Sequence, residues 1–187
     1  MSLNAKDAIE LLKAGNKKYL ADDQPVLVDA ATRAKSVEGQ SPYAIILSCA
    51  DSRVLPEAIF NEGSGRLFVL RVAGNIANTS TIASIEYAVA HLGTKLIVVL
   101  GHQNCGAVTA ALAGGDNGHN LNHLCSHIVP AIAASESSEV NDVVKVNAKT
   151  NAKALAERSA IISGAMKEGL EIVPAYYNLD SGVVDFI

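Results

Sequence analysis

Four short apolar runs are the feature that most limits how this chain can fold. Each has the length of a strand, and polar or glycine-containing segments separate them. Helical patterns occupy most of the intervals, and strands that alternate with helices predict a mostly parallel sheet covered on both faces. The expected strands are Tyr43 to Leu47, Leu67 to Val72, Leu96 to Leu100 and Leu170 to Tyr176.

The expected strand order is 2-1-3-4, a common order that places the first and third strands side by side. The tail at 182–187 is expected to add a fifth strand at the sheet edge. The fold class is therefore α/β, with a central sheet flanked by helices and an N-terminal helical arm. We predict one domain over residues 1–187, made of an arm at 1–35 and an α/β core at 42–187.

Apolar spacing and end signals indicate where the helices lie. Thr79 or Ser80 is expected to cap one helix, and Gly93 suits its C-terminal end. The polar segment 21–42 is expected to wrap over the surface. The expected helices are 1–20, 55–62, 81–92, a segment beginning near Cys105, 121–135 and 143–167.

Composition and charge argue against several classes of function. Hydrophobic residues make up 49% and charged residues 18% of the 187 positions, which is typical of a globular protein. The net charge of −4, with no basic run, argues against nucleic acid or an anionic membrane as partner. No apolar stretch has the length that crosses a bilayer, and the N-terminus lacks a signal-peptide pattern, so a cytoplasmic location is predicted.

Reactive side chains follow two of the expected strands. Cys49, Asp51 and Arg53 come just after the first strand, and His102 and Cys105 come after the third. Because the carboxyl ends of neighbouring parallel strands lie at one edge of a sheet, we expect the two loops to meet. Two thiolates and one imidazole are typical of a catalytic zinc site with an open fourth position. The sequence thus predicts one zinc ion per chain, since sulfur ligands favour zinc over magnesium or calcium.

Asp51 has two candidate roles beside such a metal. It could bind the ion directly and close the site, or it could accept a hydrogen bond from metal-bound water. Arg53 favours the second role, because a bidentate pair with its guanidinium would hold the carboxylate away from the metal.

Several segments resemble the β class of carbonic anhydrases: CADSRV, RVAGN, SIEYAVAHLG and VVLGHQNCGAV. The resemblance is specific over about 43–113, and the closing segment VPAYYNLDSGVVDF is similar more weakly. It implies zinc ligation by Cys49, His102 and Cys105 and an Asp51–Arg53 dyad. It also implies that the Gly106 backbone N–H helps to hold substrate and that Ala73, Gly74 and Asn75 line the site.

The resemblance further implies reversible hydration of carbon dioxide to bicarbonate and a proton, through attack of zinc-bound hydroxide on carbon. It implies an obligate dimer or a larger assembly such as a tetramer, with the N-terminal helix lying over the partner. Two departures stand out. Leu55 occupies a position where the family often has proline, and the chain has no tryptophan, which argues against a regulatory bicarbonate site built on that residue.

Other functions stay open at this point. A carbonyl sulfide or carbon disulfide hydrolase would use similar chemistry on the same scaffold. A non-enzymatic protein with a locked structural zinc and an enzyme with a cysteine nucleophile are further alternatives. Cys125 is interpreted as a buried thiol, and the spacing of His119, His123 and His127 is interpreted as a solvated or interface face of a helix.

Overall fold

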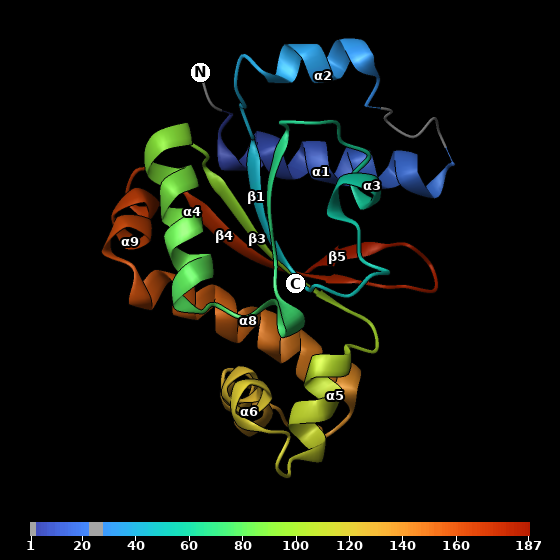
Figure 1. Cartoon of the computed structure of the whole chain (residues 1–187), viewed down its shortest axis with the longest axis vertical. Coiled ribbons are helices and arrows are strands. Elements are labelled where there is room, and N and C mark those ends of the chain that lie inside the picture. The colour runs from blue at the N-terminus through green and yellow to red at the C-terminus, as the bar shows by residue number, and fades with distance from the viewer. Residues whose placement is uncertain (1–2, 23–27) are drawn as a thin grey trace.

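A five-stranded sheet forms the centre of the molecule, as Figure 1 shows. A computed structural model describes the chain over residues 3–22 and 28–187. The strand order is β2-β1-β3-β4-β5, parallel throughout except for the antiparallel pair of β4 and β5. The predicted α/β class, strand order and edge strand are therefore confirmed. The strands are β1 (Ala44–Ser48), β2 (Leu67–Arg71), β3 (Leu96–His102), β4 (Glu171–Tyr177) and β5 (Val184–Phe186).

The central strands are apolar throughout because both faces of the sheet are covered. In β1, Ala44 and Ile46 face one hydrophobic layer, while Ile45 and Leu47 face the other, and all four are fully buried. β3 is buried along its whole length. This two-sided burial explains why the strands read as continuous apolar runs rather than as alternating ones.

Helices cover the two faces and the carboxyl end of the sheet. α1 and α3 pack on one face, and α4, α8 and α9 pack on the other. A third hydrophobic cluster, built from residues on either side of η1 and from α5, α7 and the start of α8, lies against the carboxyl ends of the strands. The helices are α1 (Ala5–Leu20), α2 (Ala30–Ser36), α3 (Pro56–Ile59), η1 (Ala73–Asn75), α4 (Thr79–Leu92), α5 (Gly106–Ala113), α6 (His119–Ser126), α7 (Val129–Ala134), α8 (Val140–Arg158) and α9 (Ala160–Met166).

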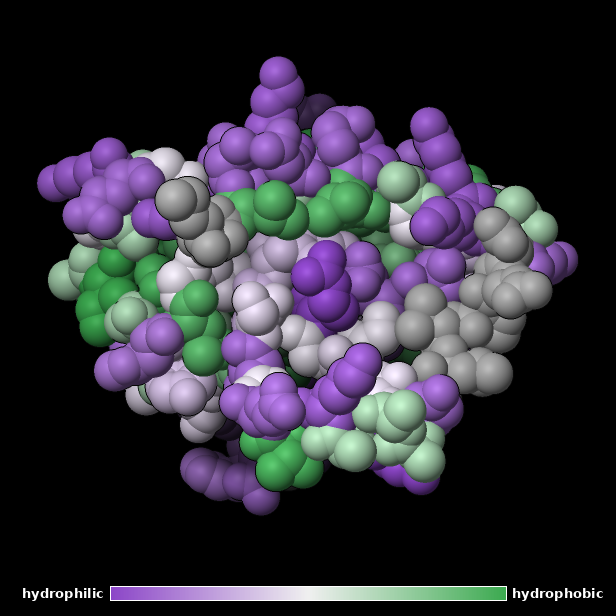
Figure 2. Space-filling view, turned by 90° about the horizontal axis from the view of Figure 1, so that it is seen from above, coloured by the Kyte–Doolittle hydropathy of each residue, from purple (hydrophilic) through white to green (hydrophobic). Residues whose placement is uncertain are grey.

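The N-terminal helix α1 packs on the sheet of its own chain. Ala8 and Leu12 are fully buried in the layer that also contains β1 and β3. Asn16 donates to the carbonyls of Ile59 and Gly182 at 3.2 and 2.9 Å. Hydrophobic side chains remain exposed in and beside α1 and α2, and Figure 2 shows such residues scattered among hydrophilic ones over this end of the molecule. The expected contact of α1 with a partner stays a prediction.

Several helix boundaries were predicted wrongly. Asn78, not Thr79 or Ser80, caps α4, because its side chain accepts from the Thr81 N–H while the Thr81 hydroxyl accepts from the Asn78 N–H. The expected helix 143–167 divides into α8 and α9 at Ser159, which is extended and caps α9 through the Ile162 N–H.

The expected helix 121–135 likewise corresponds to α6 and α7, and Pro130 lies in the first turn of α7, where its missing N–H is not needed. α2 lies inside the segment that was expected only to wrap the surface, while positions 1–2 of the first predicted helix fall outside the described residues. Over the described chain, every helix is too short or too polar to span a bilayer.

Candidate metal centre

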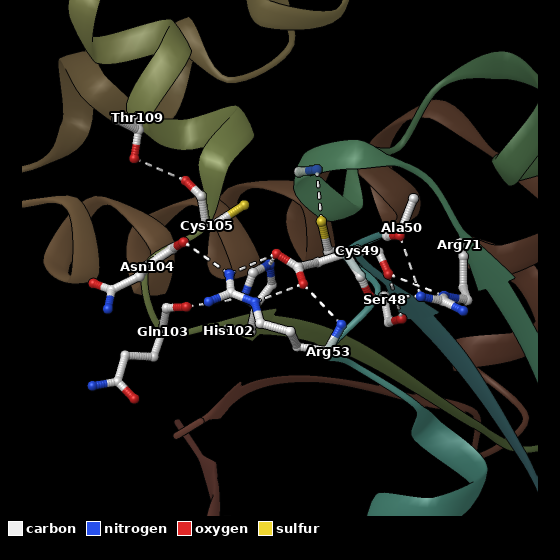
Figure 3. Close-up of polar contacts among 12 residues, drawn as sticks. Ser48, Cys49, Ala50, Arg53, Arg71, His102, Gln103, Asn104, Cys105 and Thr109 are labelled. Atoms are coloured by element: carbon white, nitrogen blue, oxygen red, sulfur yellow. Dashed lines mark hydrogen bonds and ion pairs between the residues drawn. The ribbon is translucent and has the colours of Figure 1, made fainter. Parts of the chain in front are cut away.

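Three buried side chains converge at the carboxyl end of the sheet (Figure 3). Cys49 directly follows β1, His102 is the last residue of β3, and Cys105 precedes the first residue of α5. Because β1 and β3 pair in parallel, their ends bring the two loops together. The Sγ atoms of both cysteines and a ring nitrogen of His102 lie within 4.8 Å of one another. Within the described residues, this group alone offers three potential metal ligands at such spacing.

The ring of His102 presents a free lone pair to the two sulfur atoms. Its Nδ1 lies 3.0 Å from the Gln103 carbonyl oxygen, and only a protonated Nδ1 can donate to that acceptor. In this tautomer the lone pair lies on Nε2. Nε2 is buried and has no hydrogen-bond partner among the described residues. An unpartnered nitrogen beside two thiols is a donor set that suits a soft divalent metal such as zinc.

The two thiols influence each other, and a backbone N–H also reaches one of them. The nearby Cys105 thiol lowers the pKa of Cys49, while the nearby Cys49 thiol and burial raise the pKa of Cys105. The Gly74 N–H also donates to the Cys49 sulfur, at 3.4 Å. These donors favour negative charge on Cys49, which is the form that binds metals.

Asp51 and Arg53 form a two-point ion pair beside this group. Arg53 Nε donates to Asp51 Oδ1 at 2.9 Å, and Nη2 donates to Oδ2 at 2.8 Å. The Arg53 hydrogen bonds hold the pKa of Asp51 well below its usual range, so the carboxylate is ionised at neutral pH. Asp51 Oδ2 lies 3.8 Å from His102 Nε2, which is near the converging donors but beyond hydrogen-bond distance.

Arg71, at the end of β2, is a contributor that the sequence analysis missed. Its guanidinium donates to three successive carbonyls, those of Cys49 at 3.3 Å, Ala50 at 3.2 Å and Asp51 at 2.6 Å (Figure 3). It therefore fixes the loop that carries both a thiol and the ion pair. The position of Arg71 in the sequence could have indicated this role. Arg71 stands near the end of an expected strand, just before the segment Ala73 to Asn75 that was expected to line the site.

The other predicted site residues lie around the thiols. Gly74 and Asn75 of η1 both have left-handed backbones, with φ of 71° and 44°. Both polar atoms of the Asn75 side chain are buried without a partner in the described structure. Gly106 begins α5, and a Cβ built there would meet nothing within 4 Å, so there is open space beside Cys105. A role of these residues in holding substrate stays a prediction.

Cys125 and the three histidines lie outside the converging group. Cys125 is buried on α6, as expected, and its thiol is free. The rings of His123 and His127 meet edge to face, with centroids 5.2 Å apart. Burial lowers the pKa of His127, so this ring is neutral at neutral pH.

A mostly parallel α/β sheet with a Cys2His group at its carboxyl edge defines a class of metalloprotein, and comparison with known proteins gives the family. The sequence model described as carbonic anhydrase matches residues 44–184. "Carbonic anhydrase 2" of Mycobacterium tuberculosis is 38% identical over 188 aligned residues, covering 96% of this chain and 91% of that protein. The chain therefore belongs to the carbonic anhydrase family and is an enzyme of that family, as the resemblance predicted.

Solved structures agree with this assignment. A tetrameric β-carbonic anhydrase of Sordaria macrospora aligns with a TM-score of 0.77 at 27% identity, covering 93% of this chain and 90% of that one. The β-carbonic anhydrase CafA of Aspergillus fumigatus aligns with a TM-score of 0.76 at 28% identity, covering 97% and 90%. The predicted resemblance to the β class is confirmed.

Proposed function

We propose that this protein catalyses the reversible hydration of carbon dioxide to bicarbonate and a proton with one zinc ion per chain. The observation that carries the proposal is the buried group of Cys49, His102 and Cys105, whose donor atoms lie within 4.8 Å of one another. Two thiolates and one neutral imidazole match the ligand set of catalytic zinc sites with an open fourth position. When bound, zinc would supply hydroxide at neutral pH, because it lowers the pKa of a coordinated water to about 7.

The protein's own groups have distinct tasks in this proposal. Cys49, His102 and Cys105 would hold the metal, and the Gln103 carbonyl fixes the His102 tautomer that leaves Nε2 free to bind. Asp51 would accept a hydrogen bond near the ligands. It is ionised and its two oxygens are occupied by Arg53, which keeps the carboxylate from acting as a fourth ligand.

Substrate would bind beside the ligands, at the open space next to Gly106. The backbone N–H of Gly106, in the first turn of α5, would donate to a substrate oxygen, since the first N–H groups of a helix have no partner within it. Ala73, Gly74 and Asn75 would also line the site, and the buried amide of Asn75 has spare donors and an acceptor there.

Assembly and location belong to the same proposal. The Sordaria macrospora relative is one of two tetrameric β-carbonic anhydrases of that fungus. We infer that this chain likewise self-associates as a dimer or tetramer, that residues 1–187 act as one domain with an arm at 1–35, and that the enzyme works in the cytoplasm. Light scattering at several concentrations tests the assembly, and a monomer at every concentration would contradict it.

The decisive experiment measures carbon dioxide hydration by stopped flow across about pH 6.5 to 9, with the zinc content determined on the same sample. We expect one zinc per chain and activity that rises with pH. Cys105→Ala should lose both zinc and activity, while the matched control Cys125→Ala changes a buried thiol outside the group and should keep both.

Each alternative predicts a different result. Zinc without hydration at any pH would reject the function, and carbonyl sulfide and carbon disulfide would then be the substrates to test. Asp51→Ala should keep zinc and lose turnover. If this variant loses zinc instead, Asp51 is a ligand of a closed site. Full activity of metal-free protein would indicate a cysteine nucleophile.

A further inference from the structure

Two asparagines of α8 are buried where a helix normally buries apolar residues. Asn147 is 0% exposed and Asn151 is 4% exposed. They lie four residues apart, so they share one face of the helix. Buried amides are costly unless every polar atom is hydrogen-bonded, which makes their partners informative.

The two amides form a connected network that ends on the loop beside the metal centre. The Asn151 side chain accepts from the Ala77 N–H at 2.7 Å. Its Nδ2 donates to the backbone carbonyl and to the side-chain oxygen of Asn147, each at 2.9 Å. Asn147 in turn donates to the Gly74 carbonyl at 2.9 Å. Each nitrogen and oxygen of the two amides has a partner, and such a satisfied network holds its members rigidly.

Gly74 is the residue that needs this support. Its backbone is left-handed, with φ 71° and ψ 15°, and glycine reaches many other conformations at little cost. In the observed conformation its N–H donates to the Cys49 sulfur at 3.4 Å. The amide of Asn147 fixes the Gly74 carbonyl, and so it restrains the dihedral angles that aim this N–H at the sulfur.

We propose that Asn147, supported by Asn151, is a positioning residue of the metal centre. It holds the Gly74 N–H on the Cys49 sulfur and so sets how strongly that thiolate binds metal. The inference rests on the proposed function, because it takes Cys49, His102 and Cys105 as the metal ligands. Asn147 acts through Gly74, because its side chain bonds to the Gly74 carbonyl and to Asn151 and not to any of the three ligand side chains.

The test compares Asn147→Leu with Leu155→Ala. Leucine has the same branched shape as asparagine and no polar atoms, while Leu155 is a fully buried α8 residue in the layer facing the sheet. Zinc affinity is measured by chelator competition, and the sulfur-to-metal charge-transfer band is measured on the cobalt-substituted protein. Hydrogen exchange of the Gly74 amide gives a readout that needs no metal.

For Asn147→Leu we expect about 10- to 100-fold weaker zinc binding, a charge-transfer band at longer wavelength, and faster Gly74 exchange. The band moves because a thiolate without its N–H donor holds its electrons less tightly. Leu155→Ala should lower the thermal midpoint and leave zinc affinity and the band unchanged. Asn151→Ala removes the supporting amide and leaves Asn147 in place. It should change zinc affinity, the charge-transfer band and Gly74 exchange in the same direction as Asn147→Leu, but by smaller amounts.

Unchanged zinc affinity and band position in folded Asn147→Leu would overturn the inference. If Asn147→Leu does not fold, Asn151→Ala decides, and wild-type values for it would overturn the inference equally. A wild-type protein that binds no zinc would instead refute the proposed function, so the two failures are distinguishable.

Discussion

Replacing Gly15 by alanine tests how closely α1 is docked on its own chain. Gly15 lies in the helix interior, where an exposed glycine-to-alanine change normally stabilises a protein by about 1 kcal/mol. Here a Cβ would lie 1.9 Å from the Phe60 carbonyl oxygen and 2.8 Å from its carbon. Contacts below 3.0 Å essentially never occur at a Cβ, so the helix and the carbonyl must separate by about 1 Å.

That separation also strains hydrogen bonds next to the contact. Asn16 donates to Ile59 and Gly182 and accepts from the Val184 N–H at 3.0 Å, so it joins α1 to two other segments. Overpacking costs about 1 to 3 kcal/mol, and a buried hydrogen bond left unmade costs a similar amount. After the helix-propensity gain of about 1 kcal/mol, we expect Gly15→Ala to lower the free energy of unfolding by about 2 kcal/mol or more.

Urea unfolding at fixed protein concentration provides the assay, because self-association makes apparent stability depend on concentration. Gly164→Ala is the matched control. It lies inside α9, where a Cβ would meet nothing within 4 Å, and it should raise the free energy of unfolding by about 0.5 to 1 kcal/mol. Equal or greater stability of Gly15→Ala than of wild type would refute the close packing of α1 on the Phe60 carbonyl.

Three further predictions concern the site. Removing zinc with a chelator should lower the thermal midpoint of wild type and Cys125→Ala but not of Cys105→Ala, which lacks a ligand. The depressed pKa of Asp51 contributes stability above its unfolded-state pKa of about 3.9, and that stability is lost as the pH falls through the lower folded-state pKa. The free energy of unfolding, measured with urea between about pH 5 and pH 2, should therefore depend less on pH in Asp51→Asn than in wild type. At Gly74 φ is 71°, and an added Cβ would lie 2.9 Å from Ile128 Cδ1, so Gly74→Ala should lower the free energy of unfolding by about 1 to 3 kcal/mol. Ile128→Val removes that Cδ1, and in a double-mutant cycle measured in urea it should recover part of the lost stability.

The sheet could be predicted from the sequence because its central strands carry the signal locally. Ile45 and Ile46 are both buried on opposite faces, so the run in which they lie is apolar without interruption. The convergence of Cys49 with His102 and Cys105 followed from one assumption about strand order, since adjacent parallel strands end at the same edge.

The supporting contacts could not be predicted in this way. Asn147 and Asn151 look like polar positions on an exposed helix face, and only their partners in η1 and the following loop explain their burial. The division of α8 from α9 depends on Ser159, whose hydroxyl caps α9 and donates to Glu86 at 2.6 Å. Serine inside a helical pattern does not by itself indicate a break, because it can also remain in the helix and bond to its own backbone.

The hydrogen bond from His102 to the Gln103 carbonyl has a consequence for protein design. The residue that orients the ring is its own neighbour, and Cys105 follows two positions later across the left-handed Asn104. This four-residue segment thus carries two metal donors together with the group that orients one of them, and it could be moved to another strand end as a unit. Cys49 could not, because its sulfur depends on Gly74, a residue of a different loop. A designer who transplants this centre must therefore copy one short peptide and rebuild the surroundings of a single thiol.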